Sequence, residues 1–499
     1  MTVKRLAVLT EWMGIALPLL CAPLMLFPRA RWMWVIVIIP LSWLPRLMAK
    51  GRLLEPTPLN VLLLFLILMV GVSLYATFDL EFSMGKVAGL LLGLFIYWGI
   101  AQFANSERRL NWLLAFFLIA GMGVALVGLV GTDWRLKYPA VNRFDEWFPL
   151  RLKGLPGAEK GISSTALGGV LILFMPLAAT LAAYFMPRKN RPHGRQSFAY
   201  GSLLVLLAVM SGTLLLSQAR GAWLALAAAM ALILMLKFRW TRWAFLVMMM
   251  AGGLLAIIYR PWTWENMHLS PNKRPPSARE INIGARLEFW SRAINGIQDF
   301  PITGMGMNAF RRLVRIRYPQ LNTVESDLDV AHCHNQLLQA ALDLGIPGMV
   351  AYAAIWAAVF RMLWRVWRNA QDFFHRALAL GLGGGLLAQF VFGINDAIAL
   401  GAKAGIFWWI VLALAVSLDK LQKQVRDKAA GSESKSPKAW EAPLLWVLIS
   451  LLSISLVGNH PYISLAVAIL GGTCLGLEMV KKQNREDLKD LKERETEML

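Results

Sequence analysis

Hydrophobic residues in this chain gather in long runs that recur from one end to the other. Each run has roughly 18 residues or more, enough for a helix to cross a hydrocarbon core about 30 Å thick. We therefore expect an all-α polytopic membrane protein with about 12–14 transmembrane helices. Twelve is the alternative to fourteen, because Pro40 and Pro45 interrupt the second run and the last two runs are weak. The predicted spans are residues 6–27, 33–49, 59–77, 84–105, 110–131, 162–186, 198–217, 221–237, 241–259, 336–360, 377–394, 404–419, 441–457 and 462–480.

The polar stretches between these runs divide the chain. The basic loop 132–161 and the long segment 260–334 are predicted to share the outer face of the membrane. Within the second of these, residues 285–298 and 308–318 carry hydrophobic residues at helical spacing, which predicts two short amphipathic helices. The predicted parts are an N-terminal bundle (1–259), an outer segment (260–334), further spans (335–420), a cytoplasmic linker (421–440), a C-terminal hairpin (441–480) and a charged cytoplasmic tail (481–499).

The composition agrees with this division: 57% of the residues are hydrophobic and the formal net charge is +21. Such a charge suggests nucleic acid in a soluble protein, but Lys and Arg gather in the cytoplasmic loops of polytopic membrane proteins. We expect no nucleic-acid partner. With the N-terminus inside, basic residues fill the predicted cytoplasmic loops at 108–109, 188–191, 237–239 and 361–376. The first run lacks a small-residue cleavage site after it, so we expect it to be a retained span.

The three cysteines lie far apart and predict neither a disulfide framework nor a CxxC metal site. A metal site formed by His332, Cys333, His334, Asp327 and Asp329 is the alternative. The alternating His-Cys-His order makes adjacent ligands point apart, and no second ligand pair supports it. We therefore expect no metal and no cofactor.

His334 is the strongest candidate for proton chemistry, because it lies where the chain passes from the polar segment into an apolar helix. A histidine with an ordinary pKa of about 6.5 is mostly neutral at pH 7 and can accept a proton. A sugar hydroxyl needs such a base before it becomes a good nucleophile. The simpler alternative is a histidine that hydrogen-bonds the start of a helix.

Basic residues from separate elements are predicted to reach the same outer level. Arg220 lies in SQARGAW between two apolar runs, where a charge is costly unless it has a partner or water. Its guanidinium suits phosphate oxygens, and Gly221 leaves room for a headgroup, although snorkelling to the interface is the alternative. Arg286 starts an amphipathic helix.

Two further groups of residues are candidates. Arg151 and Lys153 lie in the glycine-rich loop RLKGLPG, and Arg143 lies in the same outer loop. Together with Arg220 and Arg286 they would bind an anionic diphosphate. Asp396, at the outer end of a later span, is predicted to orient His334 or to balance the arginines.

These residues, in this order, resemble the O-antigen ligase family, within its wider grouping with O-antigen polymerases and O-oligosaccharyltransferases. The matching residues are SQARGAW at 217–223, Arg286 and Trp290, PITGMGMNAF at 301–310, and HNQLLQAALDLGIPG at 334–348. The last follows a family pattern of His, a small polar residue, nine residues, Gly, two residues and Gly.

The resemblance implies a metal-independent, inverting transferase with a membrane glycosyltransferase (GT-C-like) fold in the bacterial inner membrane. It implies that a glycan moves from undecaprenyl pyrophosphate to a sugar hydroxyl of lipid A–core at the periplasmic face. His334 then corresponds to the residue that activates the acceptor hydroxyl, and Arg220 and Arg286 to the pyrophosphate binders. The family has a single histidine here, so His332 is an alternative base, but Asn335 favours His334.

Three other functions remain open from the sequence. An O-antigen polymerase uses the same donor, and the spacing of Arg143 and Gly154 also occurs in polymerase loops. A protein-directed oligosaccharyltransferase would often carry a large soluble C-terminal domain. A non-enzymatic transporter of lipid-linked glycans would show charges along a central path and paired broken helices, whereas here the charges cluster on one face.

Overall fold

The computed structural model describes residues 3–28, 35–43, 45–46, 54–132, 134, 152, 161–187, 194–238, 240–243, 278–318, 332–429, 468–469 and 473. Within these residues the fold is all-α, with one isolated β-bridge between Thr132 and Ile162. The helices are α1 (Val3–Leu26), α2 (Val35–Leu41), α4 (Asn60–Ala76), α5 (Leu80–Phe103), α6 (Glu107–Gly131), α8 (Ser164–Phe185), α9 (Gly194–Ser217), α10 (Arg220–Lys237), α12 (Ala278–Asp299), α13 (Phe310–Arg317), α14 (Gln336–Asn369), α15 (Phe373–Asn395), the 3-10 helix η3 (Lys403–Gly405) and α16 (Ile406–Ala429).

Nine helices in the described part are long and apolar enough to cross a membrane, and α4 adds a shorter apolar helix. The protein is therefore an all-α polytopic membrane protein, as the hydrophobic runs predict. The predicted spans 241–259, 441–457 and 462–480 lie largely outside the described residues, so the total of 12–14 stays a prediction.

The boundaries differ from the predicted ones in two places. Among the described residues of the predicted span 33–49, Val35–Leu41 forms a short helix with Pro40 inside it, and residues 45–46 are helical again after a turn. At the other end of the chain, α16 continues past residue 419 to Ala429, so the linker expected at 421–440 starts too early. The helix continues because Leu421 is still buried, and an Arg365–Asp419 ion pair joins α14 to α16 just before it.

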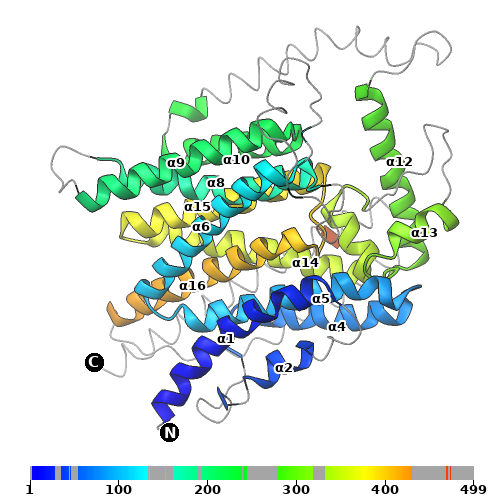
Figure 1. Ribbon diagram of the computed structural model, residues 1–499, viewed down its shortest axis with the longest axis horizontal. Coiled ribbons are helices and arrows are strands. Elements are labelled where there is room, and N and C mark those ends of the chain that lie inside the picture. Colours follow the sequence, from blue (N-terminus) through cyan, green and yellow to red (C-terminus); the bar gives the residue numbers. More distant parts are fainter. Residues whose placement is uncertain are drawn as a thin grey trace, which may run out of the picture.

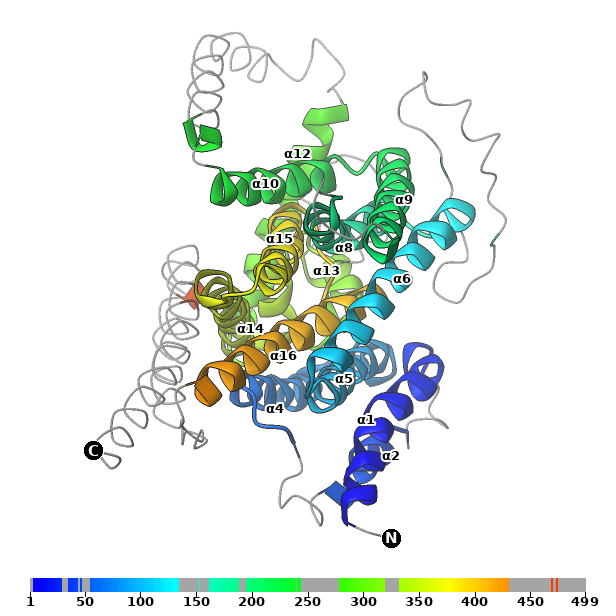
Figure 2. The same cartoon turned by 90° about the vertical axis from the view of Figure 1, so that its left-hand side faces the viewer.

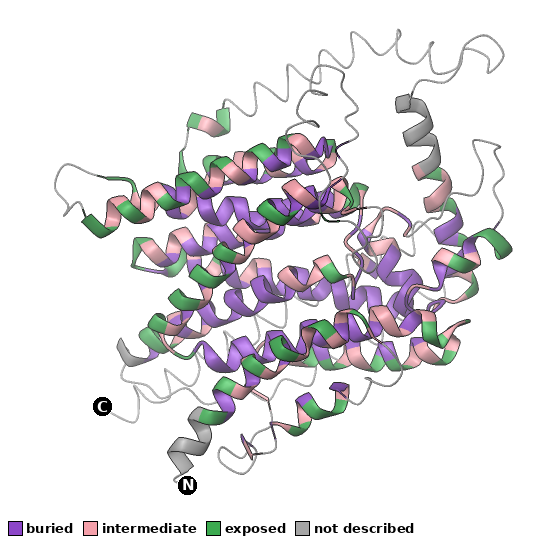
Figure 3. Cartoon of the chain, viewed as in Figure 1, coloured by how far each residue is buried: buried purple, intermediate pink, exposed green. Residues whose placement is uncertain are grey.

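Burial separates central helices from peripheral ones (Figure 3). Most of α14, α8, α5 and α16 is buried, whereas less than a third of the residues of α1, α6, α9 and α10 are buried. The exposed surface is apolar, with residues such as Phe116, Ile119 and Leu224, which suits contact with lipid chains. In the centre, Gly381 and Gly385 of α15 face α8, and small residues let membrane helices approach closely.

The helices run roughly side by side, so the bundle has two ends, and α12 and α13 lie at one of them (Figure 1). We call this the site end. Contacts gather the nearby turns there: Asn308 Nδ2 donates to the Phe82 carbonyl oxygen, and the Met305 N–H donates to the Leu342 carbonyl oxygen at 2.7 Å. The opposite end carries ion pairs between separate elements: Glu11 of α1 pairs with Arg109 of α6, and Glu55, before α4, pairs with Lys420 of α16.

The turn after α15 is pressed against α5 at the site end. Gly401 has φ of +75°, and a Cβ there would overlap the carbonyl oxygen of Lys86. Only glycine accepts both this backbone conformation and this approach. The close contact fixes the turn 396–402, which starts with Asp396, against the first turns of α5, beside the start of α14.

Candidate active site

The site is built around the histidine loop, which we define as residues His332–Asn335. The backbone of His334 has φ of +56°, an uncommon conformation outside glycine. Asn335 is the N-cap of α14: its Oδ1 accepts from the Leu337 and Leu338 N–H groups, at 3.0 and 3.1 Å. Its Nδ2 donates to the Ile394 carbonyl oxygen at 3.1 Å. One side chain thus caps α14 and ties the loop to the end of α15.

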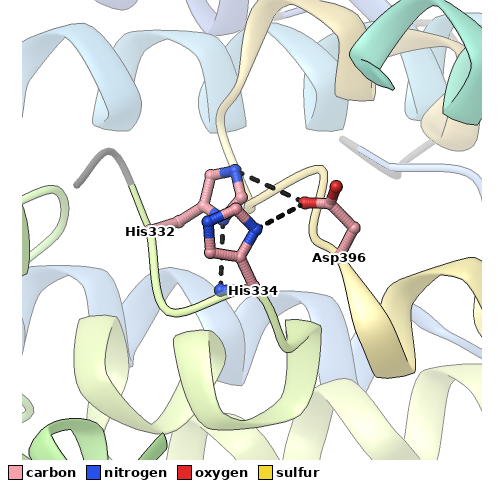
Figure 4. Close-up of side chains that lie close together, drawn as sticks. All are labelled: His332, His334 and Asp396. Atoms are coloured by element: carbon pink, nitrogen blue, oxygen red, sulfur yellow. Dashed lines mark hydrogen bonds and ion pairs between the residues drawn. The ribbon is translucent and has the colours of Figure 1, made fainter. Parts of the chain in front are cut away.

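Both histidines of the loop face one carboxylate (Figure 4). His334 Nδ1 lies 3.1 Å from Asp396 Oδ1, and His332 Nε2 lies 3.7 Å from the same oxygen. The backbone N–H of His334 donates to His332 Nδ1 at 3.2 Å. Since Nδ1 of His332 accepts, its proton belongs on Nε2, facing Asp396. A neutral His334 that donates from Nδ1 to Asp396 keeps Nε2 unprotonated, which leaves that nitrogen able to accept a proton.

Electrostatics keep these groups in defined charge states. Burial lowers the pKa of His332 to about 4, helped by the neighbouring His334 and opposed by Asp396. Burial acts to raise the pKa of Asp396, but the hydrogen bond and charge of His334 bring it below its ordinary value. At neutral pH, His332 is therefore uncharged and Asp396 is an anion.

An aromatic side chain from α12 closes one side of the base. The ring of Phe289 stacks on the His334 ring, with centroids 5.7 Å apart and planes 25° apart. Stacking of this kind fixes the orientation of the imidazole and excludes water from its face. Phe289 lies one turn from Arg286, so α12 supplies both an aromatic wall and a cation.

Arg286 and the start of α10 approach this centre at Asn395. Arg286 Nη1 donates to Asn395 Oδ1 at 2.6 Å, next to Asp396 in the chain. A Cβ on Gly221 would lie 3.8 Å from Asn395 Nδ2, so the start of α10 is in contact with the same amide. Arg220 is the first residue of α10 and its side chain is exposed. Three elements distant in sequence therefore meet at residues 395–396.

Other predicted site residues fall where the structure gives no description. Arg143, Arg151 and Lys153 lie outside the described residues, and so do Asp327 and Asp329. Their placement relative to the histidine loop stays a prediction.

His332, His334 and Asp396 also have the spacing of a metal site. The ligand atoms of His332, His334 and Asp396 all lie within 4.8 Å of one another. As expected for adjacent ligands, Cys333 points away from the histidines: it is fully buried, with its Sγ 3.4 Å from the Asn335 carbonyl oxygen. The two histidines, two residues apart, both face Asp396. Burial also raises the pKa of Cys333 to about 12, so a thiolate ligand is not available.

Buried polar residues beneath the loop were not singled out from the sequence. Asp343 Oδ1 accepts from Gln339 Nε2 at 2.9 Å, and Gln339 Oε1 accepts from the Cys333 N–H at 3.0 Å. Lys86 of α5 acts electrostatically on Asp343 and on His332. The sequence does contain a signal for them: Lys86 and Asp343 lie inside apolar runs. Charged side chains are costly at such positions and are usually functional.

Residues 205–353 match the family described as O-antigen ligase. This segment is similar to the O-antigen ligase family. The match includes Arg220, Arg286 and the histidine loop, whereas Lys86, Asn395 and Asp396 lie outside it. It supports a glycosyltransferase role of the ligase or polymerase type in a multi-pass membrane protein.

A comparison with curated proteins adds a distant relative to the O-antigen ligase match. An uncharacterized protein of Haemophilus influenzae is 24% identical over 211 residues, which make up 40% of this chain. The aligned region covers 51% of that relative, so the chain spans about half of the relative's length.

Proposed function

We propose that this protein is an O-antigen ligase. It transfers a glycan from undecaprenyl pyrophosphate to a sugar hydroxyl of lipid A–core, at the periplasmic face of the bacterial inner membrane. The observation that carries the proposal is the contact of His334 with Asp396, immediately beside Asn395, which holds Arg286. A base and a phosphate-binding cation are thus neighbours, as a diphosphosugar donor requires.

The proposed reaction is a single displacement with inversion. The acceptor hydroxyl oxygen attacks the anomeric carbon while its proton passes to Nε2 of His334. The bond from the anomeric carbon to the pyrophosphate oxygen breaks, and undecaprenyl pyrophosphate leaves with the electron pair. Asp396 stabilises the imidazolium that forms, because its carboxylate faces the Nδ1 proton.

Arg220 and Arg286 are proposed to bind the diphosphate. Negative charge grows on the leaving group as the bond breaks, so fixed guanidinium groups stabilise the transition state more than the ground state. Arg143, Arg151 and Lys153 are proposed to add cations from the 132–161 loop. The exposed apolar surface around the bundle suits two substrates that both diffuse in the membrane. A metal is not required in this scheme.

The test is a matched pair of histidine variants, His334→Gln and His332→Gln, assayed as purified protein with lipid-linked donor and lipid A–core. We expect His334→Gln to lower kcat by about 10²–10⁴-fold, the usual contribution of a general base. His332→Gln should have a much smaller effect, because His332 is neutral, accepts a backbone N–H through Nδ1 and lies farther from Asp396 than His334 does. The opposite ranking would make His332 the base, and equal small losses would remove the base assignment.

A chelator arm in the same assay separates the proposed base from the metal alternative. The proposed mechanism predicts unchanged turnover after exhaustive chelation. Loss of activity that returns with added zinc would support a metal held by His332, His334 and Asp396 instead.

A strain that lacks the protein separates ligase from polymerase. Loss of a ligase leaves long polymer stranded on the polyprenyl carrier, whereas loss of a polymerase leaves single repeat units there. We expect long polymer, and its attachment to lipid A–core should return with the wild-type chain and not with Arg220→Ala.

A further inference from the structure

A groove with both charged and apolar walls opens at the site end, between α13 and the start of α5. Its volume is about 450 Å³. The lining consists of three guanidinium side chains and three apolar side chains, namely Arg311, Arg312, Arg315, Phe78, Phe82 and Ile316. We call it the arginine groove. Its walls suit a ligand that is anionic at one place and apolar at another.

One arginine of the groove is held by its neighbours on and before α5. Arg312 forms an ion pair with Asp79 and lies over the Phe82 ring, 4.1 Å from its centroid. Arg315 and Ile316 are exposed, so a guanidinium group and an apolar side chain are both accessible to a ligand.

Lys86 links the arginine groove to the histidine loop. This lysine lies one helical turn after Phe82 on α5, and it acts electrostatically on both Arg311 and His332. Basic side chains therefore occupy the region between α13 and the histidine loop. Neighbouring like charges repel one another, and an anion bound between them relieves that repulsion.

The diphosphate site lies on another side of the same loop. Arg286 and the start of α10 reach it through Asn395, from α12 and α10. In the view along the bundle, α10 and α5 lie on opposite sides of α14 and α15 (Figure 2). Transfer between two lipids needs two lipid sites with the base between them. The donor occupies the side of Asn395, which leaves the side of Lys86 and α13 for the second lipid.

We propose that the arginine groove binds a phosphate group of the lipid acceptor, with the apolar part of that lipid against Phe78, Phe82 and Ile316. This assignment rests on the proposed function, because it takes the second lipid to be the acceptor of the glycan. Guanidinium groups bind phosphate through two parallel hydrogen bonds, which positions a phosphorylated saccharide as well as holding it. Its hydroxyl is then directed along Lys86 to His334.

The test compares Arg315→Gln and the double variant Arg311→Gln/Arg315→Gln with Arg317→Gln. Arg317 is on the same helix but pairs with Asp299, away from the groove. We expect the KM for lipid A–core to rise about tenfold or more in the groove variants, since a charge-assisted hydrogen bond is lost. The KM for the lipid-linked donor should stay unchanged, and Arg317→Gln should behave as wild type. Arg315→Lys should recover part of the affinity.

Binding without turnover tests the groove independently of the proposed reaction. His334→Gln protein is mixed with lipid A–core, with the same lipid after removal of its phosphates, or with phosphatidylglycerol vesicles as competitor. Weaker binding of the dephosphorylated lipid, with little competition from phosphatidylglycerol, supports the proposal. Equal binding of both lipids, full competition by phosphatidylglycerol, or a donor KM that rises with the acceptor KM overturns it. Absence of any transfer by the wild-type protein overturns the proposed function instead, because the binding arm does not depend on turnover.

Discussion

At the scale of single residues, the central contact is the one between a carboxylate and an imidazole. Asp396 Oδ1 accepts from the Ala397 N–H at 2.8 Å, which fixes the oxygen that faces His334 Nδ1. The neighbouring Asn395 holds Arg286. Two consecutive side chains thus contact the two proposed functional groups: Asp396 faces the imidazole of the proposed base, and Asn395 holds Arg286, the proposed phosphate ligand.

Asp396→Asn should inactivate without unfolding. The amide that replaces the carboxylate donates to Nδ1 of His334, which moves the imidazole proton to Nε2 and removes the base. We expect kcat to fall about 10²–10⁴-fold with little change in donor affinity. Asp372→Asn is the matched control, because Asp372 caps the other end of α15 in an exposed position. A near-normal kcat of Asp396→Asn would show that Asp396 does not act in the reaction.

His332 predicts a particular dependence of stability on pH. Its folded-state pKa is about 4, below the ordinary value of 6.5, so the unfolded chain binds more protons between these values. The contribution of neutral His332 is fully present above pH 6.5 and is lost as the pH falls toward 4. We expect the Tm of the wild-type protein to fall more steeply over this range than that of His332→Gln. Parallel slopes would mean that the unprotonated state of His332 is not maintained by the fold.

At the scale of elements, the kink in α14 anchors the outer helices. Gly345 interrupts α14 with φ of +72°, just before Pro347. The Ile346 N–H, free at this kink, donates to the Pro301 carbonyl oxygen at 2.8 Å. The turn between α12 and α13 therefore docks on the broken helix, and this contact sets the positions of Arg286 and of the arginine groove.

Gly345→Ala should destabilise the protein by about 2–4 kcal/mol, through positive-φ strain and the overlap of a Cβ with the Ile302 carbonyl oxygen. Activity should fall together with stability, because α12 and α13 lose their anchor. Denaturation of the purified protein followed by helical CD measures the change. Gly123→Ala is the control, since a Cβ at Gly123 meets nothing within 4 Å. Equal stability of the two variants would show that the kink tolerates a side chain.

At the scale of the whole molecule, charged residues are arranged differently at the two ends of the bundle. The opposite end joins separate elements through ion pairs such as Arg109–Glu11 and Lys420–Glu55. The site end carries exposed arginines, Arg220 and Arg315 among them, near the proposed base. The distribution of Lys and Arg along the chain predicts that the opposite end is cytoplasmic, which puts the site end in the periplasm.

Cysteine labelling in cells checks this orientation. In a background with Cys21, Cys333 and Cys474 replaced by Ala, Ile302→Cys lies at the site end and Gln371→Cys at the opposite end, both exposed. A membrane-impermeant maleimide should label Ile302→Cys in osmotically opened cells, and Gln371→Cys only after the inner membrane is lysed. The reverse labelling would invert the protein and exclude a periplasmic reaction.

The hydrophobic pattern alone determined the helices, because each apolar run is long enough to decide its own structure in a membrane. It determined the two amphipathic helices for the same local reason, and the motif around His334 indicated the family that the match at 205–353 supports. The ends of helices are harder to predict from the sequence. For example, α16 continues past its predicted end because the buried Leu421 and the Arg365–Asp419 ion pair favour the helix.

Only the tertiary structure decided which helix ends are neighbours. Nothing local to residues 332–335 says that Asp396 will face both histidines, that Asn395 will join Arg286 to the start of α10, or that Lys86 will approach from α5. These contacts join residues that are distant in the chain, and they depend on how glycines such as Gly401 let the turns of separate helices pack together. Apolar periodicity predicts that a helix is buried or faces lipid, but it does not predict the partner of each polar residue at the helix ends.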